Sequence, residues 1–156
     1  MACINAVEWD GVEAQTNDRG IAFGHTVPRI FLADDQEEIR RTVASMLQDE
    51  FEIVGFAENG RQVLEFMINR SPDILVLDIC MPVLNGIETA ARLKGCGYPT
   101  KVLFLTVQED PDFIDTAMSV GALGYVSKAH LATDLIVAIR SVLEGRIFIS
   151  PCIHSR

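Results

Sequence analysis

Basic residues are scarce in this chain: 13 lysines and arginines stand against 22 aspartates and glutamates, and the formal net charge is −9. Proteins hold the phosphates of nucleic acids mainly with lysine and arginine side chains. The charge balance therefore argues against a nucleic-acid-binding surface. A surplus of carboxylates suits a cation site or a basic partner, although acidic soluble proteins are common.

Two kinds of binding motif are also absent. The four cysteines form no C-x-x-C pair and have no histidine at metal-ligand spacing, so a zinc site is not expected. Neither a G-x-G-x-x-G segment nor a P-loop lysine motif is present, and nucleotide binding therefore has no support.

Segments for export or membrane insertion are missing as well. The first residues carry no basic region, and Glu8 and Asp10 interrupt any apolar run, which argues against a secretory signal peptide. No stretch approaches the roughly 20 consecutive apolar residues that a membrane-spanning helix needs. We therefore expect no membrane association and a cytoplasmic protein.

The chain does contain enough apolar sequence for one buried core. Apolar residues make up 49% of its 156 residues and charged residues 22%, which is the balance of a globular domain. Residues 1–27 show no sustained period and are expected to form a flexible leader or extension. The folded domain is predicted over residues 28–149, and residues 150–156 are predicted to be a short tail or the start of a linker.

Five apolar segments of strand length alternate with five helical patterns. The predicted strands cover residues 30–33, 53–57, 74–78, 102–106 and 124–128. The helical patterns lie around residues 39–47, 60–67, 87–94, 111–121 and 132–143. Polar residues suited to capping precede two of these helices, Asn59 and Asp110. The alternation predicts an α/β fold with a parallel sheet covered by helices on both faces.

Polar residues end four of these strands: Asp34 and Asp35, then Asp78, Thr106 and Lys128. Ligands of open α/β sheets bind outside the carboxyl ends of the strands, so these side chains form the candidate site. Each also has an ordinary structural explanation when it is taken alone. Asp35 could cap the following helix, for example, and Asp78 could form a turn.

The combination of these residue types points to phosphoryl chemistry. Three carboxylates at one sheet edge repel each other, and a bound hard cation such as Mg²⁺ relieves that repulsion. A lysine and a hydroxyl in the same crevice suit a phosphoryl group whose charge the metal partly neutralises. The set therefore indicates a phosphoryl-transfer site with a carboxylate nucleophile.

Four motifs in this order resemble the signature of response-regulator receiver domains. They are Leu32-Ala33-Asp34-Asp35, Leu77-Asp78-Ile79-Cys80-Met81-Pro82 with Asn85-Gly86, Leu105-Thr106, and Gly124-Tyr125-Val126-Ser127-Lys128. The C-terminal part, with Ala138-Ile139-Arg140 and Ile147-Phe148-Ile149-Ser150-Pro151, is similar to the NarL/FixJ type. The resemblance implies a flavodoxin-like, CheY-like fold, which is a doubly wound five-stranded parallel sheet in the order 2-1-3-4-5.

The resemblance also implies a role for each site residue. Asp78 would be the phosphoacceptor of a two-component signalling protein. Mg²⁺ would be held by Asp34, Asp35, Asp78 and the backbone carbonyl of Cys80. Thr106 and Lys128 would bind phosphoryl oxygens. The chain would then be a signalling switch that catalyses only its own phosphorylation and dephosphorylation.

The same family implies the switch and its partners. Thr106 and Tyr125 would change a protein–protein surface after phosphorylation by a sensor histidine kinase or a phosphotransfer protein, and the chain could form a homodimer. NarL/FixJ-type transcription regulators usually continue into a DNA-binding helix-turn-helix domain, but only residues 152–156 follow Pro151 here. We therefore expect no DNA binding by this chain itself; such a domain would belong to a longer protein.

Two other functions fit parts of the pattern. A Mg²⁺-dependent phosphatase of the haloacid-dehalogenase type would use an aspartyl nucleophile with a second aspartate two residues later, where this chain has Cys80. A receiver-like interaction module that does not use phosphorylation would need none of the site residues, and all of them are present. A phosphodonor assay separates both from a phosphoacceptor.

Overall fold

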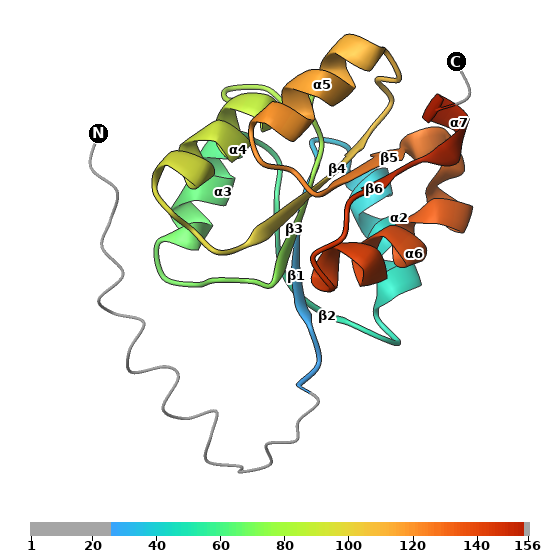
Figure 1. Cartoon of the computed structure of the whole chain (residues 1–156). Helices are drawn as coiled ribbons and strands as arrows, with labels where there is room; N and C mark the ends of the chain where they lie inside the picture. Colours follow the sequence, from blue (N-terminus) through green and yellow to red (C-terminus); the bar gives the residue numbers. More distant parts are fainter. Residues whose placement is uncertain (1–25, 155–156) are drawn as a thin grey trace.

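A computed structural model describes residues 26–154 of the chain (Figure 1). Nearly all of the predicted leader, residues 1–27, therefore lies outside the described residues. The strands are β1 (Arg29–Ala33), β2 (Glu52–Ala57), β3 (Ile74–Leu77), β4 (Lys101–Thr106), β5 (Gly124–Ser127) and β6 (Phe148–Ile149). The α-helices are α2 (Glu37–Leu47), α3 (Gly60–Met67), α4 (Gly86–Gly95), α5 (Pro111–Ser119), α6 (Leu131–Leu143) and α7 (Pro151–His154), and the 3₁₀ helix η3 (Lys128–His130) follows β5.

The six strands form one parallel sheet in the order β2-β1-β3-β4-β5-β6. The predicted α/β fold and the order 2-1-3-4-5 are confirmed, and the sheet gains one strand that the prediction did not include. This strand, β6, pairs only Phe148 and Ile149 with Gly124 and Tyr125 of β5. Two residues are too few for a hydrophobic period to show in the sequence.

Helices cover both faces of the sheet, and each strand contributes alternate side chains to the two faces (Figure 1). Phe31 of β1 and Leu75 of β3 belong to the core beneath α3, α4 and α5. Ile30 and Ile74, their neighbours in sequence, belong to the second core, beneath α2 and α6. Burial on both faces explains why these strands are continuous apolar runs. It also leaves the strand ends as the place where polar groups can gather.

Two predicted helix caps are present, and a third is not. Asn59 accepts a hydrogen bond from the backbone N–H of Gln62 at 2.9 Å, and Asp110 accepts one from the N–H of Asp112 at 2.8 Å. The explanation of Asp35 as a helix cap is wrong: Gln36 holds the N-cap position of α2, without a side-chain cap hydrogen bond. The Asp35 side chain is therefore not used to start the helix.

The C-terminal segment packs against the sheet. Ser150 is fully buried, and its backbone N–H donates to the carbonyl of Tyr125 at 2.9 Å. Ile153 of α7 is 5% exposed and packs in the core beneath α5. Ser150 and Ile153 are thus buried against the folded domain.

Candidate functional site

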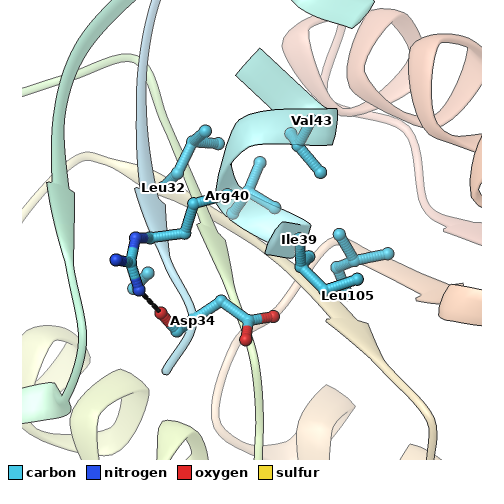
Figure 2. Close-up of a pocket in the computed structure, with 8 residues that line it drawn as sticks. Leu32, Asp34, Ile39, Arg40, Val43 and Leu105 are labelled. Atoms are coloured by element: carbon cyan, nitrogen blue, oxygen red, sulfur yellow. Dashed lines mark hydrogen bonds between the residues drawn. The ribbon is translucent and has the colours of Figure 1, made fainter. Parts of the chain in front are cut away.

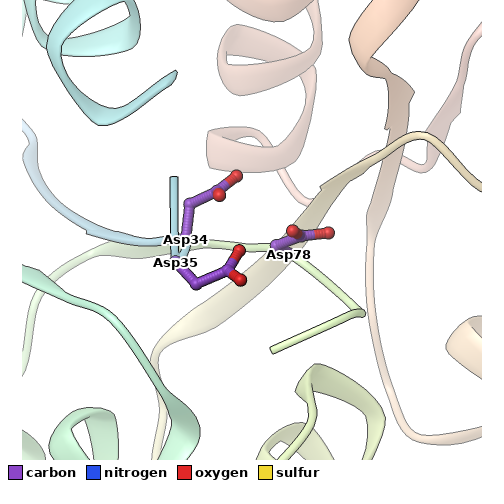
Figure 3. A group of neighbouring side chains, drawn as sticks. All are labelled: Asp34, Asp35 and Asp78. Carbon is purple, nitrogen blue, oxygen red and sulfur yellow. The ribbon is translucent and has the colours of Figure 1, made fainter. Parts of the chain in front are cut away.

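Three carboxylates meet at the carboxyl end of the sheet (Figure 3). Asp34 and Asp35 follow β1 and Asp78 follows β3, and these strands are neighbours whose last residues, Ala33 and Leu77, are paired. One carboxylate oxygen from each aspartate lies within 4.8 Å of the others. Asp34 and Asp78 are buried and Asp35 is exposed. The topology therefore builds a half-buried acidic cluster that opens to solvent at Asp35.

Lys128 reaches this cluster from the end of β5. Its ammonium nitrogen lies 2.8 Å from Oδ2 of Asp34 and 3.1 Å from Oδ2 of Asp78, and the Lys128 side chain is only 9% exposed. It also donates a hydrogen bond to Oε1 of Gln36 at 3.3 Å. One cation thus stands between two buried carboxylates.

The pKa shifts of Asp78 and Lys128 indicate an excess of negative charge at the site. Burial, and then the charge of Asp34, raise the pKa of Asp78, although Lys128 and the backbone N–H of Cys80 act in the opposite direction. Burial disfavours the ammonium of Lys128, but Asp34 and Asp78 outweigh that cost and raise its pKa. One lysine does not fully compensate three carboxylates, so the site can accept a further positive charge.

The donor set fits a hard cation. Carboxylate oxygens from Asp34, Asp35 and Asp78 are the ligands that Mg²⁺ and Ca²⁺ prefer. Oδ2 of Asp34 is buried and makes no hydrogen bond, and its ion pair with Lys128 is its one polar contact among the described residues. Such an oxygen keeps lone pairs free for a ligand. The orientation of the Cys80 carbonyl toward a metal stays a prediction.

Thr106 and Tyr125 lie on the adjacent strands β4 and β5 and are both fully buried. The Thr106 hydroxyl accepts a hydrogen bond from the backbone N–H of Gln108 at 3.3 Å, and the Tyr125 hydroxyl donates one to the Gln108 carbonyl at 2.7 Å. Burial raises the pKa of Tyr125 above its usual value. Tyr125 is therefore neutral, and its ring occupies the inward position.

Several residues at the site were not foreseen from the sequence. Gln108 contacts Thr106 and Tyr125 through its backbone, and its side-chain amide lies 3.5 Å from Sγ of Cys80. Arg40 donates a hydrogen bond to the backbone carbonyl of Asp34 at 2.6 Å. These contacts join a side chain to a backbone group or to a loop far away in the sequence. The spacing of residues along the chain therefore could not predict them.

Gly86 lies against the backbone that carries Asp78. Its N–H donates to the carbonyl of Ile79 at 2.8 Å, and a Cβ added at residue 86 would collide with the carbonyl oxygen of Asp78. Only glycine allows α4 to begin this close to the end of β3. Asn85 then caps the helix in a capping box with Glu88.

Residues 30–140 match the family model described as the response regulator receiver domain. The chain belongs to this family. It is a receiver domain of a signalling protein rather than an enzyme that turns over a substrate. The acidic cluster Asp34, Asp35 and Asp78 is consistent with the metal site of receiver domains.

Individual relatives agree with this assignment. A Pseudomonas aeruginosa protein named as a transcriptional regulator is 39% identical over 120 residues, which are 76% of this chain and 58% of that protein. The transcriptional regulatory protein DesR of Bacillus subtilis is 35% identical over 124 residues, 78% of this chain and 61% of DesR. The receiver domain thus spans about three-fifths of the length of these relatives.

Solved structures share the fold. A two-component response regulator of the LuxR family from Aurantimonas sp. SI85-9A1 superposes with a TM-score of 0.79 at 27% identity, covering 83% of this chain and 94% of that one. Among the helices of residues 26–154, none has the length and apolar character required to span a bilayer.

Proposed function

We propose that Asp78 accepts a phosphoryl group and that this modification switches a protein-binding surface of the domain. The observation that carries the proposal is the convergence of Asp34, Asp35 and Asp78 with the buried ammonium of Lys128. Lys128 pairs with two of these carboxylates, and the third lies within 4.8 Å of them, which leaves a surplus of partly buried negative charge that costs stability. The excess negative charge is explained if the carboxylates bind a cation and one of them accepts a phosphoryl group.

The proposed step is an in-line displacement on a phosphohistidine of a sensor histidine kinase or a phosphotransfer protein. A carboxylate oxygen of Asp78 forms a bond to phosphorus while the P–N bond breaks, and its electron pair leaves with the imidazole nitrogen of the donor. Lys128 lies 3.1 Å from Oδ2 of Asp78, where its charge neutralises a phosphoryl oxygen. Hydrolysis of the acyl phosphate by water returns the Asp78 carboxylate and releases inorganic phosphate.

Asp34, Asp35, Asp78 and the backbone carbonyl of Cys80 are the groups we propose to hold Mg²⁺. When it is bound, the ion neutralises charge on the phosphoryl oxygens. Asp35 is the exposed member of the set and faces the solvent from which donor and cation arrive. Asp34 is buried and already paired with Lys128, so we assign it mainly to contact through water.

The proposed switch runs through Thr106 and Tyr125. A phosphoryl group on Asp78 offers a stronger acceptor to the Thr106 hydroxyl than the groups around it in the unmodified chain. Thr106 shares Gln108 with Tyr125, so a movement of Thr106 changes the loop that holds the tyrosine ring inward. Phosphorylation then shifts the domain between two conformations that differ at the face formed by α5, β5 and α6.

We further infer a cytoplasmic regulator that works through a cognate histidine kinase and forms homodimers. Relatives of this chain are named as transcriptional regulators, and a control of transcription fits this family. The whole chain carries a formal net charge of −9, so we assign any DNA contact to a part of the whole protein outside it.

The phosphatase alternative is less well supported. Such an enzyme needs a second carboxylic acid two residues after its nucleophile, and Cys80 holds that position, with its side chain exposed and near the Gln108 amide. A receiver-like module without phosphorylation remains the main competitor, and the next experiment decides between the two.

The test incubates the chain with acetyl phosphate and Mg²⁺ and measures intact mass. We expect a gain of one phosphoryl group that requires Mg²⁺ and disappears in Asp78→Asn. Asp115→Asn, an exposed aspartate on α5, is the matched control and should be modified like the wild type. A wild-type chain that gains no mass, or an Asp78→Asn chain that still gains it, overturns the proposal.

A further inference from the structure

Arg40 of α2 folds back over the first turn of its helix to the end of β1 (Figure 2). One guanidinium nitrogen donates a hydrogen bond to the backbone carbonyl oxygen of Asp34 at 2.6 Å, in a partly buried position. Arg40 also lines a small pocket whose other walls are mostly apolar side chains from α2, β1, β3 and β4. They include Leu32, Ile39, Val43, Val76 and Leu105. An apolar surround of this kind strengthens a charged hydrogen bond.

The carbonyl that Arg40 holds belongs to the peptide unit between the two adjacent acids. A peptide unit is planar, so fixing the Asp34 carbonyl also fixes the N–H of Asp35 and the direction in which the chain leaves for the Asp35 side chain. Asp35 has no hydrogen bond of its own that orients its carboxylate among the described residues. The position of this exposed carboxylate therefore depends on its backbone.

Asp34 itself is held from other sides. Its N–H donates to the Ala57 carbonyl at 3.0 Å, and Oδ1 accepts from the N–H of Gln36 at 2.8 Å. Oδ2 is paired with Lys128 at 2.8 Å. The Asp34 carbonyl belongs to the peptide unit that leads to Asp35. Its hydrogen-bond donor is the Arg40 side chain.

We infer that Arg40 is a positioning residue for the cation site: it aims Asp35 at Asp78 by holding the Asp34 peptide carbonyl. The inference rests on the proposed function, because it gives Arg40 a role only if the acidic cluster binds a divalent cation. Arg40 bonds to backbone rather than to a carboxylate, so it orders the ligands without occupying their oxygens. Lys128, in contrast, occupies two of them.

Two effects of Arg40 on cation binding have opposite signs. Its positive charge repels Mg²⁺, so removing it would tighten binding if charge were its only contribution. Its hydrogen bond orders the ligands, so removing it loosens binding if Arg40 acts by position. Partners that orient metal ligands are worth about 10- to 100-fold in metal affinity, and we take this ordering effect to be the larger of the two. Arg40→Gln should therefore weaken binding.

The experiment titrates MgCl₂ into the unphosphorylated full chain by isothermal calorimetry. We expect Arg40→Gln to raise the Kd for Mg²⁺ about tenfold, and Arg40→Lys, which keeps the charge and one donor, to fall between it and the wild type. Arg41→Gln is the matched control, since Arg41 is exposed on the same helix and pairs with Glu37. It should bind Mg²⁺ like the wild type.

A second measurement uses acetyl phosphate at increasing Mg²⁺. For Arg40→Gln the Mg²⁺ concentration at half-maximal phosphorylation rate should rise, while the rate at saturating Mg²⁺ stays close to that of Arg41→Gln. A merely structural role would lower the saturating rate instead. The inference is overturned if Arg40→Gln binds Mg²⁺ as tightly as Arg41→Gln or more tightly. If the wild type itself binds no Mg²⁺, the proposed function fails first.

Discussion

The hydroxyl of Tyr125 donates a 2.7 Å hydrogen bond to the backbone carbonyl of Gln108, two residues beyond Thr106. The buried tyrosine ring on β5 is therefore tied to the loop that leaves β4 beside the acidic cluster. The bond is thus a specific link between the proposed phosphorylation site and the α5–β5–α6 face.

Tyr125→Phe removes this bond and leaves the ring in place. We expect the free energy of unfolding to fall by about 1 kcal/mol and the amide protons of residues 107–110 to exchange faster with solvent. Calorimetry and hydrogen exchange measure the two effects. Tyr98→Phe is the control, because the Tyr98 hydroxyl has no hydrogen-bond partner among the described residues. Equal protection of residues 107–110 in the two variants would contradict the link.

Asp78→Asn should stabilise the domain when no divalent cation is present. Burial and the charge of Asp34 raise the pKa of Asp78, so the ionised form is less stable in the folded chain than in the unfolded chain. A raised carboxyl pKa destabilises the fold in full above the folded pKa, and the penalty shrinks as the pH falls below that value and is gone below the pKa of the unfolded chain. At neutral pH with EDTA, the Tm of Asp78→Asn should exceed that of the wild type.

Mg²⁺ should reverse the order of the two Tm values, because it binds the wild type more tightly than Asp78→Asn. A ligand at a concentration of 100 times its Kd stabilises the folded state by about 2.7 kcal/mol. The Tm of the wild type should rise with MgCl₂ and that of Asp78→Asn should rise less. Scanning calorimetry with EDTA and with MgCl₂ measures both, and a lower Tm for Asp78→Asn in EDTA would refute the assigned cause.

Ser150→Ala should destabilise the attachment of the C-terminal segment. The Ser150 hydroxyl is fully buried, accepts a hydrogen bond from the N–H of Ser127 at 3.1 Å and donates one to Oδ2 of Asp134 at 2.7 Å. Its loss leaves a buried N–H without a partner, which costs about 1–3 kcal/mol. Urea denaturation measures the change, and Ser119→Ala, at an exposed site on α5, should change stability by less than about 0.5 kcal/mol.

Val83→Gly should stabilise the loop between β3 and α4. Val83 has a φ of 70° and is 72% exposed, and the N–H of Leu84 donates to the Pro82 carbonyl at 2.7 Å, which closes a three-residue turn around it. A β-branched residue in this left-handed region costs about 1–2 kcal/mol. We expect the unfolding free energy to rise by about 1 kcal/mol after the entropy cost of glycine is subtracted.

Val107→Gly is the comparison for this variant, because Val107 is similarly exposed but has no positive φ. It should lose stability, since glycine adds freedom to the unfolded chain without relieving strain. Chemical denaturation of both variants measures the difference. If both lose the same amount, Val83 is not strained.

The parallel sheet could be predicted because burial on two faces leaves a strong mark on the sequence, whereas its strand order was implied by the resemblance to receiver domains. Ile74 to Leu77 is entirely apolar and entirely buried. The next residue, Asp78, breaks this apolar run, and burial in a hydrophobic core does not explain an aspartate there. The rule that ligands bind at the carboxyl ends of parallel strands is enough to predict that Asp34, Asp35 and Asp78 lie together. The short β6 was not predicted, because its two residues show no period.

Contacts to the backbone could not be predicted in the same way. The bonds from Arg40 to the Asp34 carbonyl and from Tyr125 to the Gln108 carbonyl depend on the path of the loops. Arginine on the polar side of a helix is usually solvated, so Arg40 carries no special signal in the sequence. The capping explanation of Asp35 failed because the turn at Asp34 shifts the start of α2 by one residue, to the N-cap at Gln36.

The absence of space beside Gly86 limits how this protein can vary. A methyl group at residue 86 would meet the carbonyl oxygen of Asp78, so even alanine would displace the backbone of the proposed phosphoacceptor. A library with all twenty amino acids at residue 86, selected for phosphorylation, should return glycine alone. The same library at the exposed Val83 should return many residues. The tolerance of this loop to mutation is therefore decided by contact with the backbone of Asp78, and not by distance from its carboxylate.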